Sequence, residues 1–219
     1  MAIQALFWDN DGVLVDTEKL YFQATREILE TVGIDLTEAL FRQISLREGR
    51  SAFELAGRQG IAPEAIEGLV EERNRRYTDL VHGGVQIMDG VVEALRALQG
   101  RVAMGIVTSC RRGHFEAIHQ GTGELLSYFD FVLAREDYGL SKPDPEPYRT
   151  ALAKVGLPAE ACLAIEDSPR GLVSAVGAGL RCIVVPNALT QGSDFAAAWR
   201  VLESCREIPA EIAQYNGGA

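Results

Sequence analysis

Short apolar segments alternate with helical segments after Gly90, and this alternation constrains the fold more than any other feature of the sequence. Strands are predicted over residues 102–107, 131–134, 163–165 and 182–185, and helices over 91–98, 145–155 and 169–178. Strands that alternate with helices are typical of a parallel sheet with both faces covered. Residues 3–8, which are short and apolar, fit a further buried strand of the same sheet.

The stretch between this first strand and residue 85 shows helical spacing only. Asp16 or Thr17 can cap a helix that Gly33 ends, and apolar residues recur in between. Further helices are predicted near residues 40–44, 53–56 and 66–81, with breaks at Gly60 and Pro63. The chain is therefore predicted to be an α/β protein with an all-helical insertion after its first strand. Because the insertion leaves and rejoins near the end of that strand, we expect it over the carboxyl edge of the sheet.

Two carboxylates, Asp9 and Asp11, close the first apolar strand and are followed at once by Gly12. In open parallel sheets, ligands bind beyond the carboxyl ends of the strands. The sequence Asp-x-Asp-Gly is also common in ordinary turns, so this segment alone indicates a site only weakly.

Polar residues also follow three later segments. Thr108 and Ser109 come after the strand 102–107, where a hydroxyl group and backbone N–H groups can hold phosphate oxygens at a helix start. Lys142 stands in a turn before the helix 145–155, which Asp144 can cap, and could neutralise an anion. Glu166 and Asp167 follow the strand 163–165, and two adjacent carboxylates favour a hard divalent cation such as Mg²⁺. Ser168 is the predicted cap of the next helix.

The composition narrows the class of ligand. A net charge of −10 argues against general binding to nucleic acid or to anionic membranes, and leaves a small anionic substrate possible where positive charge is local. The sequence has no apolar run long enough to span a bilayer and no signal-peptide pattern, so we expect a cytoplasmic protein. The four cysteines are interpreted as buried apolar groups in a reducing compartment. The three histidines lack metal-ligand spacing and are predicted at the surface or at helix ends.

The order of these motifs resembles that of the haloacid dehalogenase superfamily of phosphotransferases over essentially the whole chain. The matching residues are Asp9-Asn10-Asp11-Gly12, Thr108, Lys142 and Glu166-Asp167. The resemblance implies a Rossmann-like core of residues 1–16 and 86–219, and a helical cap domain of residues 17–85 like that of phosphoglycolate phosphatases and β-phosphoglucomutases.

The resemblance also implies roles for the motif residues. Asp9 would attack phosphorus and form an aspartyl-phosphate, and Asp11 would act as general acid and base. Mg²⁺ would be bound by Asp9, the Asp11 backbone carbonyl, Asp167, and Glu166 through water, while Thr108, Ser109 and Lys142 would bind the phosphoryl oxygens. Ser109 stands where many relatives have Asn, and Asp89 where many have Pro, so the phosphate pocket and the hinge of the cap can differ here.

Residues of the cap would recognise the leaving group of a small phosphorylated metabolite. The candidates are Tyr21, Arg47, Arg50, Ser51, Arg73, Asn74 and Arg76. For each arginine the alternative is a solvated helix face balanced by neighbouring glutamates.

Three functions remain open at this stage. The first is a Mg²⁺-dependent phosphatase acting on a sugar phosphate or a phosphoglycolate-like acid, as a monomer or homodimer. The second is a β-phosphoglucomutase-like mutase: Arg111 stands where those mutases have a lysine, whereas Tyr21 stands where they have a cap histidine. The third is a binding or regulatory relative without turnover, which the complete acidic set argues against.

Overall fold

The structure, a computed structural model, describes residues 2–218. In that range six strands form one sheet, and their bounds are β1 Ala5–Trp8, β2 Ala103–Val107, β3 Phe131–Leu133, β4 Cys162–Glu166, β5 Arg181–Val184 and β6 Arg200–Val201. The α-helices are α1 Glu18–Glu30, α2 Glu38–Phe41, α3 Glu54–Arg58, α4 Pro63–His82, α5 Val91–Leu98, α6 Arg112–His119, α7 Glu146–Val155, α8 Pro169–Gly177 and α9 Ile208–Gly217. A π-helical segment, Arg42–Arg47, continues α2.

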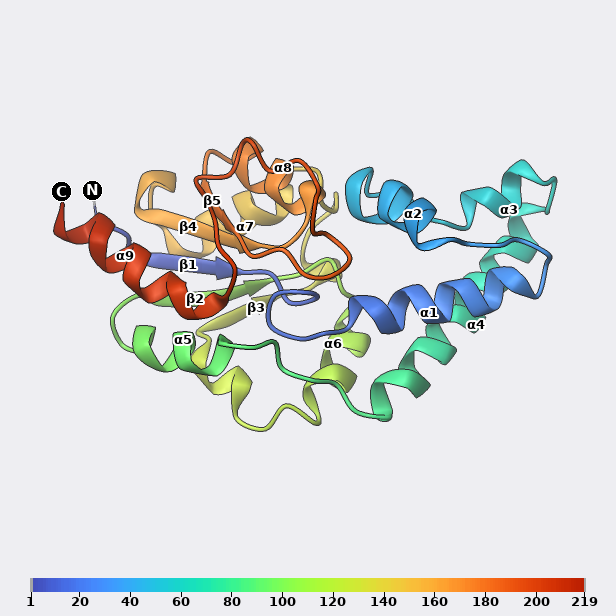
Figure 1. The fold of residues 1–219 in the computed structure, drawn as a ribbon, viewed down its shortest axis with the longest axis horizontal. Helices are drawn as coiled ribbons and strands as arrows, with labels where there is room; N and C mark the ends of the chain where they lie inside the picture. The colour runs from blue at the N-terminus through green and yellow to red at the C-terminus, as the bar shows by residue number, and fades with distance from the viewer. Residues whose placement is uncertain (1, 219) are drawn as a thin grey trace.

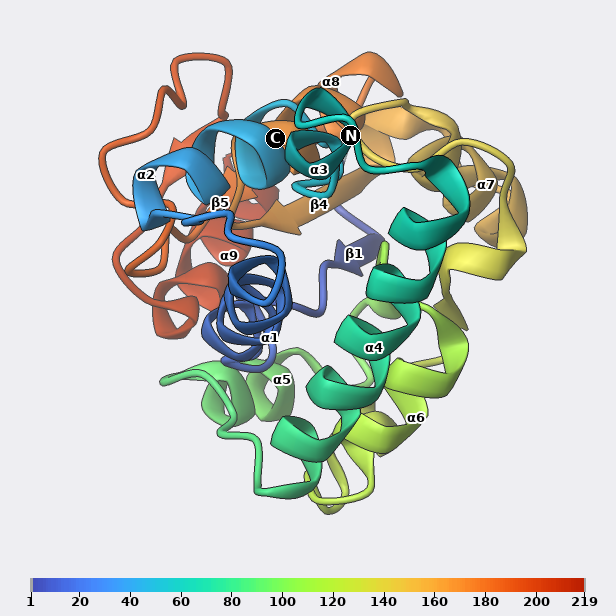
Figure 2. The same ribbon diagram turned by 90° about the vertical axis from the view of Figure 1, so that its right-hand side faces the viewer.

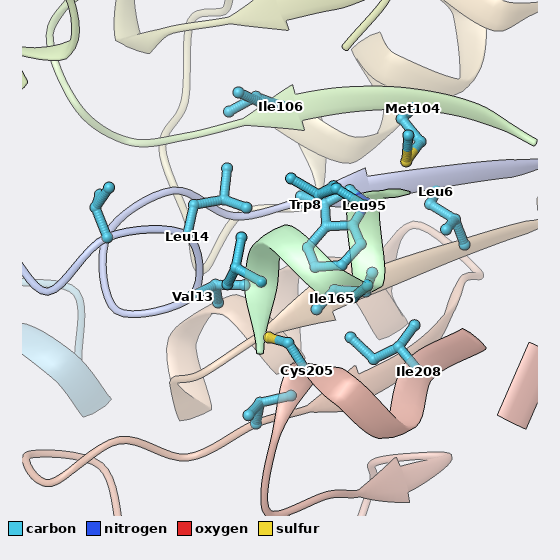
Figure 3. Close-up of a cluster of buried hydrophobic side chains, with 14 of the residues drawn as sticks. Leu6, Trp8, Val13, Leu14, Leu95, Met104, Ile106, Ile165, Cys205 and Ile208 are labelled. Atoms are coloured by element: carbon cyan, nitrogen blue, oxygen red, sulfur yellow. The ribbon is translucent and has the colours of Figure 1, made fainter. Parts of the chain in front are cut away.

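The sheet is parallel throughout, in the order β3-β2-β1-β4-β5-β6, which confirms the predicted α/β core. Helices lie on both of its faces (Figure 1). Leu6 and Trp8 of β1 pack with residues of α5, α6 and α9, whereas Ala5 and Phe7 pack with residues of α7 and α8. All four side chains are fully buried because β1 is central and covered on both sides, and Figure 3 shows the first of these two clusters.

The helices α1 to α4 form the inserted all-helical part, and they lie beyond the arrowhead end of β1 (Figure 1). Viewed from that side, α1 and α4 stand in front of the sheet (Figure 2). The insertion has an apolar cluster of its own, which includes Leu29, Phe41 and Phe53. It therefore covers the edge of the sheet at which the predicted motif residues lie.

The structure differs from the prediction in several local details. It contains α6, β6 and α9, which are not predicted from the sequence. Thr17 does precede α1, but its hydroxyl makes no cap and donates to Asp11 instead. The helix predicted from residue 145 begins at Glu146, while Ser168 caps α8 as predicted. His119 lies at a helix end, the last residue of α6, which agrees with one of the two predicted positions, and its ring is buried.

The cysteines are all free, as expected; three are buried, and Cys110 is half-buried. Within residues 2–218 no helix is both long and apolar enough to cross a membrane.

Candidate active site

A cavity of about 350 Å³ lies between the carboxyl edge of the sheet and the helical insertion. Asp9, Asp11 and Ser109 line it from the sheet side, and Arg73 and Tyr21 line it from the insertion. Because the carboxyl ends of parallel strands meet at one edge, residues far apart in the sequence converge here.

Three buried carboxylates form the floor of this site. Asp9, Glu166 and Asp167 each offer one oxygen, and these oxygens lie within 4.8 Å of one another. Burial raises the pKa of Asp167 well above its ordinary value, and the neighbouring carboxylates of Glu18, Asp9 and Glu166 raise it further. Burial likewise raises the pKa of Glu166, with Asp9 adding to the effect. Keeping three adjacent buried carboxylates ionised costs free energy unless positive charge lies beside them.

Two oxygens of this cluster, Glu166 Oε2 and Asp167 Oδ1, are buried and find no hydrogen-bond donor among residues 2–218. Buried polar atoms are rarely left unpaired, so each orphaned oxygen needs an explanation. A small divalent cation with a preference for oxygen, such as Mg²⁺, would satisfy both oxygens and reduce the repulsion. The donor set therefore fits the cation that the sequence predicts.

Lys142 is almost fully buried and joins two of the carboxylates. Its Nζ donates to Asp9 Oδ1 at 2.9 Å, to Glu166 Oε1 at 2.6 Å and to the Val107 carbonyl at 2.8 Å. Burial alone would lower the pKa of Lys142, but the charges of Asp9 and Glu166 outweigh that effect and raise it. The lysine is therefore a fixed cation beside Asp9 and not a solvated loop residue.

Asp11 accepts hydrogen bonds from residues of both the sheet edge and the insertion. Thr108 Oγ1 donates to its Oδ2 at 3.2 Å, and Thr17 donates to its Oδ1. Thr108 Oγ1 also accepts from the Cys110 N–H at 3.0 Å. Ser109 lies beside them, where its hydroxyl accepts from Ser141 at 3.0 Å. Asp11 is thus fixed at the cavity wall with Asp9.

Two glycines make room for these groups. A Cβ on Gly171 would lie 1.9 Å from Glu166 Oε2, which no side chain could tolerate without displacing the carboxylate. Gly12 has a φ of +84°, and a Cβ there would lie 2.5 Å from Asp167 Oδ2. Gly12 is therefore required for two reasons: its φ is positive, and any Cβ at this position would collide with Asp167.

The predicted substrate residues of the insertion separate into two groups. Tyr21, Arg50, Ser51, Arg73 and Asn74 line the cavity, whereas Arg47 and Arg76 are not among its lining residues. Arg47 is exposed, and Arg76 pairs with Glu27 on the helix surface. Arg50 also pairs with Glu48 and Glu54, although it reaches the rim.

Arg73 differs from the other arginines in its surroundings. It is only 8 % exposed, and its guanidinium lies over the ring of Tyr21, 4.3 Å from the centroid. Its side chain donates hydrogen bonds to the neutral side chains of Asn74 and Thr25. Among residues 2–218 no carboxylate lies within 4.0 Å of it, so its charge faces the cavity without a counter-ion.

Two further residues of the site, Glu18 at the cavity and Asn187 beside the carboxylates, are not predicted from the sequence. Burial raises the pKa of Glu18 to about 8, and the Asp11 carboxylate contributes, although Arg170 opposes the shift. Asn187 donates to Asp167 Oδ2 at 2.7 Å and to Glu18 at 3.4 Å. The place of Asn187 shortly after β5 is the same signal that marks the other motifs and could have found it. Nothing in the sequence distinguishes Glu18 from other helix glutamates.

Comparisons with known proteins agree with this geometry. Residues 6–185 match the family model described as haloacid dehalogenase-like hydrolase. Protein CbbY of Rhodobacter capsulatus is 33% identical over 92% of this chain and 93% of its own. A phosphorylated carbohydrates phosphatase of Thermotoga maritima is 30% identical over 91% of this chain and 93% of its own.

Among solved structures, a mutant of CbbY from Rhodobacter sphaeroides in complex with xylulose-(1,5)bisphosphate superposes with a TM-score of 0.80. It is 28% identical and covers 94% of this chain and 96% of its own. The extent of these matches establishes that the chain belongs to the haloacid dehalogenase-like hydrolase family.

Proposed function

We propose that this protein is a Mg²⁺-dependent phosphatase that hydrolyses a phosphorylated carbohydrate through an aspartyl-phosphate. The observation that carries the proposal is the joint position of Asp9 and Asp11 on one cavity wall, beside the buried carboxylates of Glu166 and Asp167. A phosphoric monoester hydrolase needs a nucleophile, a proton carrier and positive charge for the phosphoryl oxygens, and this site offers each of them.

In the first step an oxygen of the Asp9 carboxylate attacks phosphorus and forms the acyl-phosphate bond. The ester oxygen leaves with its electron pair and takes a proton from Asp11. In the second step a water attacks phosphorus, gives a proton to Asp11, and releases phosphate with Asp9 restored. Lys142, which already contacts Asp9 Oδ1, orients the nucleophile and offsets the charge of the phosphoryl oxygens.

Asp9, the Asp11 carbonyl, Asp167 and Glu166 would hold the cation. When bound, Mg²⁺ would neutralise charge on the phosphoryl group and on the clustered carboxylates. Thr108 and Ser109 would bind phosphoryl oxygens through hydroxyl and backbone N–H groups. The insertion would cover the cavity and exclude water during transfer.

Local positive charge in an otherwise acidic chain supports an anionic carbohydrate as the substrate. Arg73 lines the cavity from the insertion and has no acidic partner in the described part of the chain, while the net charge of the whole sequence is −10. A second phosphate or a carboxylate on the substrate would complement Arg73. The relative solved with xylulose-(1,5)bisphosphate supports the same class, so we propose a sugar bisphosphate as the preferred substrate.

A phosphomutase is the second candidate, and Arg111 at the cavity rim is the residue that favours it. A mutase must protect its phosphoenzyme from water, and the cap histidine expected for that role is replaced by Tyr21, whose ring instead supports Arg73. A phosphatase therefore fits these residues better.

The test is phosphate release from p-nitrophenyl phosphate and from a panel of sugar monophosphates and bisphosphates, with and without Mg²⁺. We expect release that requires Mg²⁺ and is abolished by Asp9→Asn. Activity retained by Asp9→Asn would exclude the proposed nucleophile. Products that stay phosphorylated, with dependence on a bisphosphate activator, would show a mutase, and no turnover of the whole panel would indicate a non-catalytic relative.

A further inference from the structure

Asn10 lies between the two proposed catalytic aspartates, and its side chain is completely buried. Asp9 and Asp11 line the cavity, whereas Asn10 is not among the lining residues and its side chain reaches α6. There its Oδ1 lies 2.8 Å from Nε2 of His119, the last residue of α6. The buried pair of Asn10 and His119 therefore lies beside the catalytic loop, residues 9–12, and does not line the cavity.

The contacts of Asn10 favour one arrangement of its amide group while Asp11 is ionised. Asn10 Nδ2 donates to Asp11 Oδ2 at 3.3 Å. The reversed amide would place its oxygen against an oxygen of the ionised carboxylate, which is repulsive. With Asp11 ionised, the amide oxygen therefore faces His119.

This orientation fixes the proton of the imidazole ring in turn. Because Asn10 Oδ1 is an acceptor, His119 Nε2 has to carry a proton. His119 Nδ1 is then an acceptor. The Thr122 hydroxyl lies 2.9 Å from this nitrogen and 3.3 Å from the His119 carbonyl, and with Nδ1 unprotonated its one proton goes to the nearer acceptor. In this arrangement the Thr122 hydroxyl donates to His119 Nδ1, and His119 Nε2–H donates to Asn10 Oδ1. Asn10 Nδ2 then donates to Asp11 Oδ2.

The surroundings hold this series rigid. The ring of Phe115 packs on His119 with 4.4 Å between the centroids, and His119 and Thr122 are both almost fully buried. The backbone carbonyl of Asn10 accepts from the N–H groups of Leu14 and Val15 at 2.9 and 3.1 Å. Asn10 therefore connects α6 to the turn that carries Asp11.

We propose that Thr122, His119 and Asn10 form a positioning chain that sets the orientation of the Asp11 carboxylate for proton transfer. None of the three residues lines the cavity, and Asn10 alone of them donates to the Asp11 carboxylate, so the series acts through Asp11. The proposal rests on the proposed phosphatase activity, in which Asp11 is the general acid and base. It concerns which residues aim that carboxylate, a question that the four motifs leave open.

The first test is the state of the ring, which needs no activity. Two-bond ¹H–¹⁵N spectra of the full-length protein near neutral pH should show the Nε2–H tautomer of His119, and Thr122→Val should perturb its Nδ1 resonance. A predominant Nδ1–H tautomer would overturn the proposal, because the Asn10 amide would then be reversed.

The second test separates positioning from stability with a double-mutant cycle. Asn10→Leu and His119→Phe each leave a buried polar group unpaired, whereas the double variant removes both partners and should regain much of the lost stability. A positioning role predicts that kcat of the stable double variant stays about tenfold below that of the wild type, with KM little changed. His119→Gln, which keeps an amide N–H near the place of Nε2, should restore most of kcat.

The matched control is Asn216→Leu, the same substitution in α9, where Asn216 contacts Ile3 just before β1 begins. Asn216 holds the backbone of Ile3 there, so this variant should lose stability while keeping kcat. Wild-type kcat in the double variant would overturn the proposal and leave the phosphatase intact. Absence of phosphate release by the wild type would instead refute the proposed function. The tautomer of His119 would still decide whether Thr122, His119 and Asn10 form the proposed hydrogen-bonded series.

Discussion

The buried ring of His119 makes stability depend on pH in a defined direction. Burial lowers the pKa of His119 from 6.5 to about 4. Between these values the unfolded chain binds a proton that the folded protein does not bind. The contribution of His119 to the free energy of unfolding is therefore complete above the unfolded pKa, and it is lost as the pH falls from about 6.5 towards 4.

The size of the effect follows from the two pKa values. At pH 7.5 the ring is neutral in both the folded and the unfolded state, so its titration hardly changes the free energy of unfolding. At pH 5 the unfolded state is almost fully protonated and the folded state is mostly neutral, which lowers the free energy of unfolding by about 2 kcal/mol. A glutamine at this position would not titrate, so the loss should be absent from His119→Gln.

The assay is urea denaturation of the wild type and of His119→Gln at several pH values between 5 and 7.5. The difference in unfolding free energy between the two proteins should change by about 2 kcal/mol over this range, in favour of the variant at low pH. Glu18, with a pKa raised to about 8, acts in the opposite direction, but it is present in both proteins and cancels. Parallel stability curves would refute the burial argument for His119.

Three other substitutions test separate parts of the site. Arg73→Met keeps the packing on the insertion but removes the charge, so the ratio of kcat/KM for a sugar bisphosphate to that for a monophosphate should fall about tenfold; an unchanged ratio would contradict the proposed substrate class. Lys142→Met leaves the carboxylates of Asp9 and Glu166 buried without their cation, so urea denaturation in the absence of added metal should show a loss of about 3–5 kcal/mol, and wild-type stability would count against the ion pairs. Gly171→Ala should displace the carboxylate of Glu166 and weaken Mg²⁺ binding more than tenfold, as is typical when a metal site is disturbed. Titration calorimetry measures this affinity, and an unaltered value would show that Glu166 does not belong to the metal site.

The fold could be predicted where a strand or helix carries its own signal. The apolar strands β1, β2, β4 and β5 and the helices of the insertion agree with their predicted positions within a few residues. The strand β6 has two residues, both exposed, so no apolar pattern marks it. The helix α9 has a weak amphipathic pattern, and its apolar residues find partners only in the folded core.

The site could be predicted where polar residues directly follow strands. Asp9, Thr108 and Asp167 each follow a strand of the parallel sheet, and topology alone brings their carboxyl ends together. The roles of His119 and Glu18 depend on which helix packs against the catalytic loop, and local sequence does not reveal that packing. The same limit applies to the arginines of the insertion, because only the folded structure shows that Arg73 is buried against Tyr21 while Arg76 pairs with Glu27 at the surface.

The most direct test of the central claim is to look for the phosphoryl group on Asp9. Asp11→Asn should slow the release of phosphate more than its transfer when the second step lacks its base, so the phosphoenzyme should accumulate. After mixing this variant with Mg²⁺ and a sugar bisphosphate, quenching in acid and mapping the peptides by mass spectrometry, we predict one added phosphoryl group on Asp9. An unmodified Asp9 under conditions in which substrate is still consumed, or a phosphoryl group on another residue, would contradict the account.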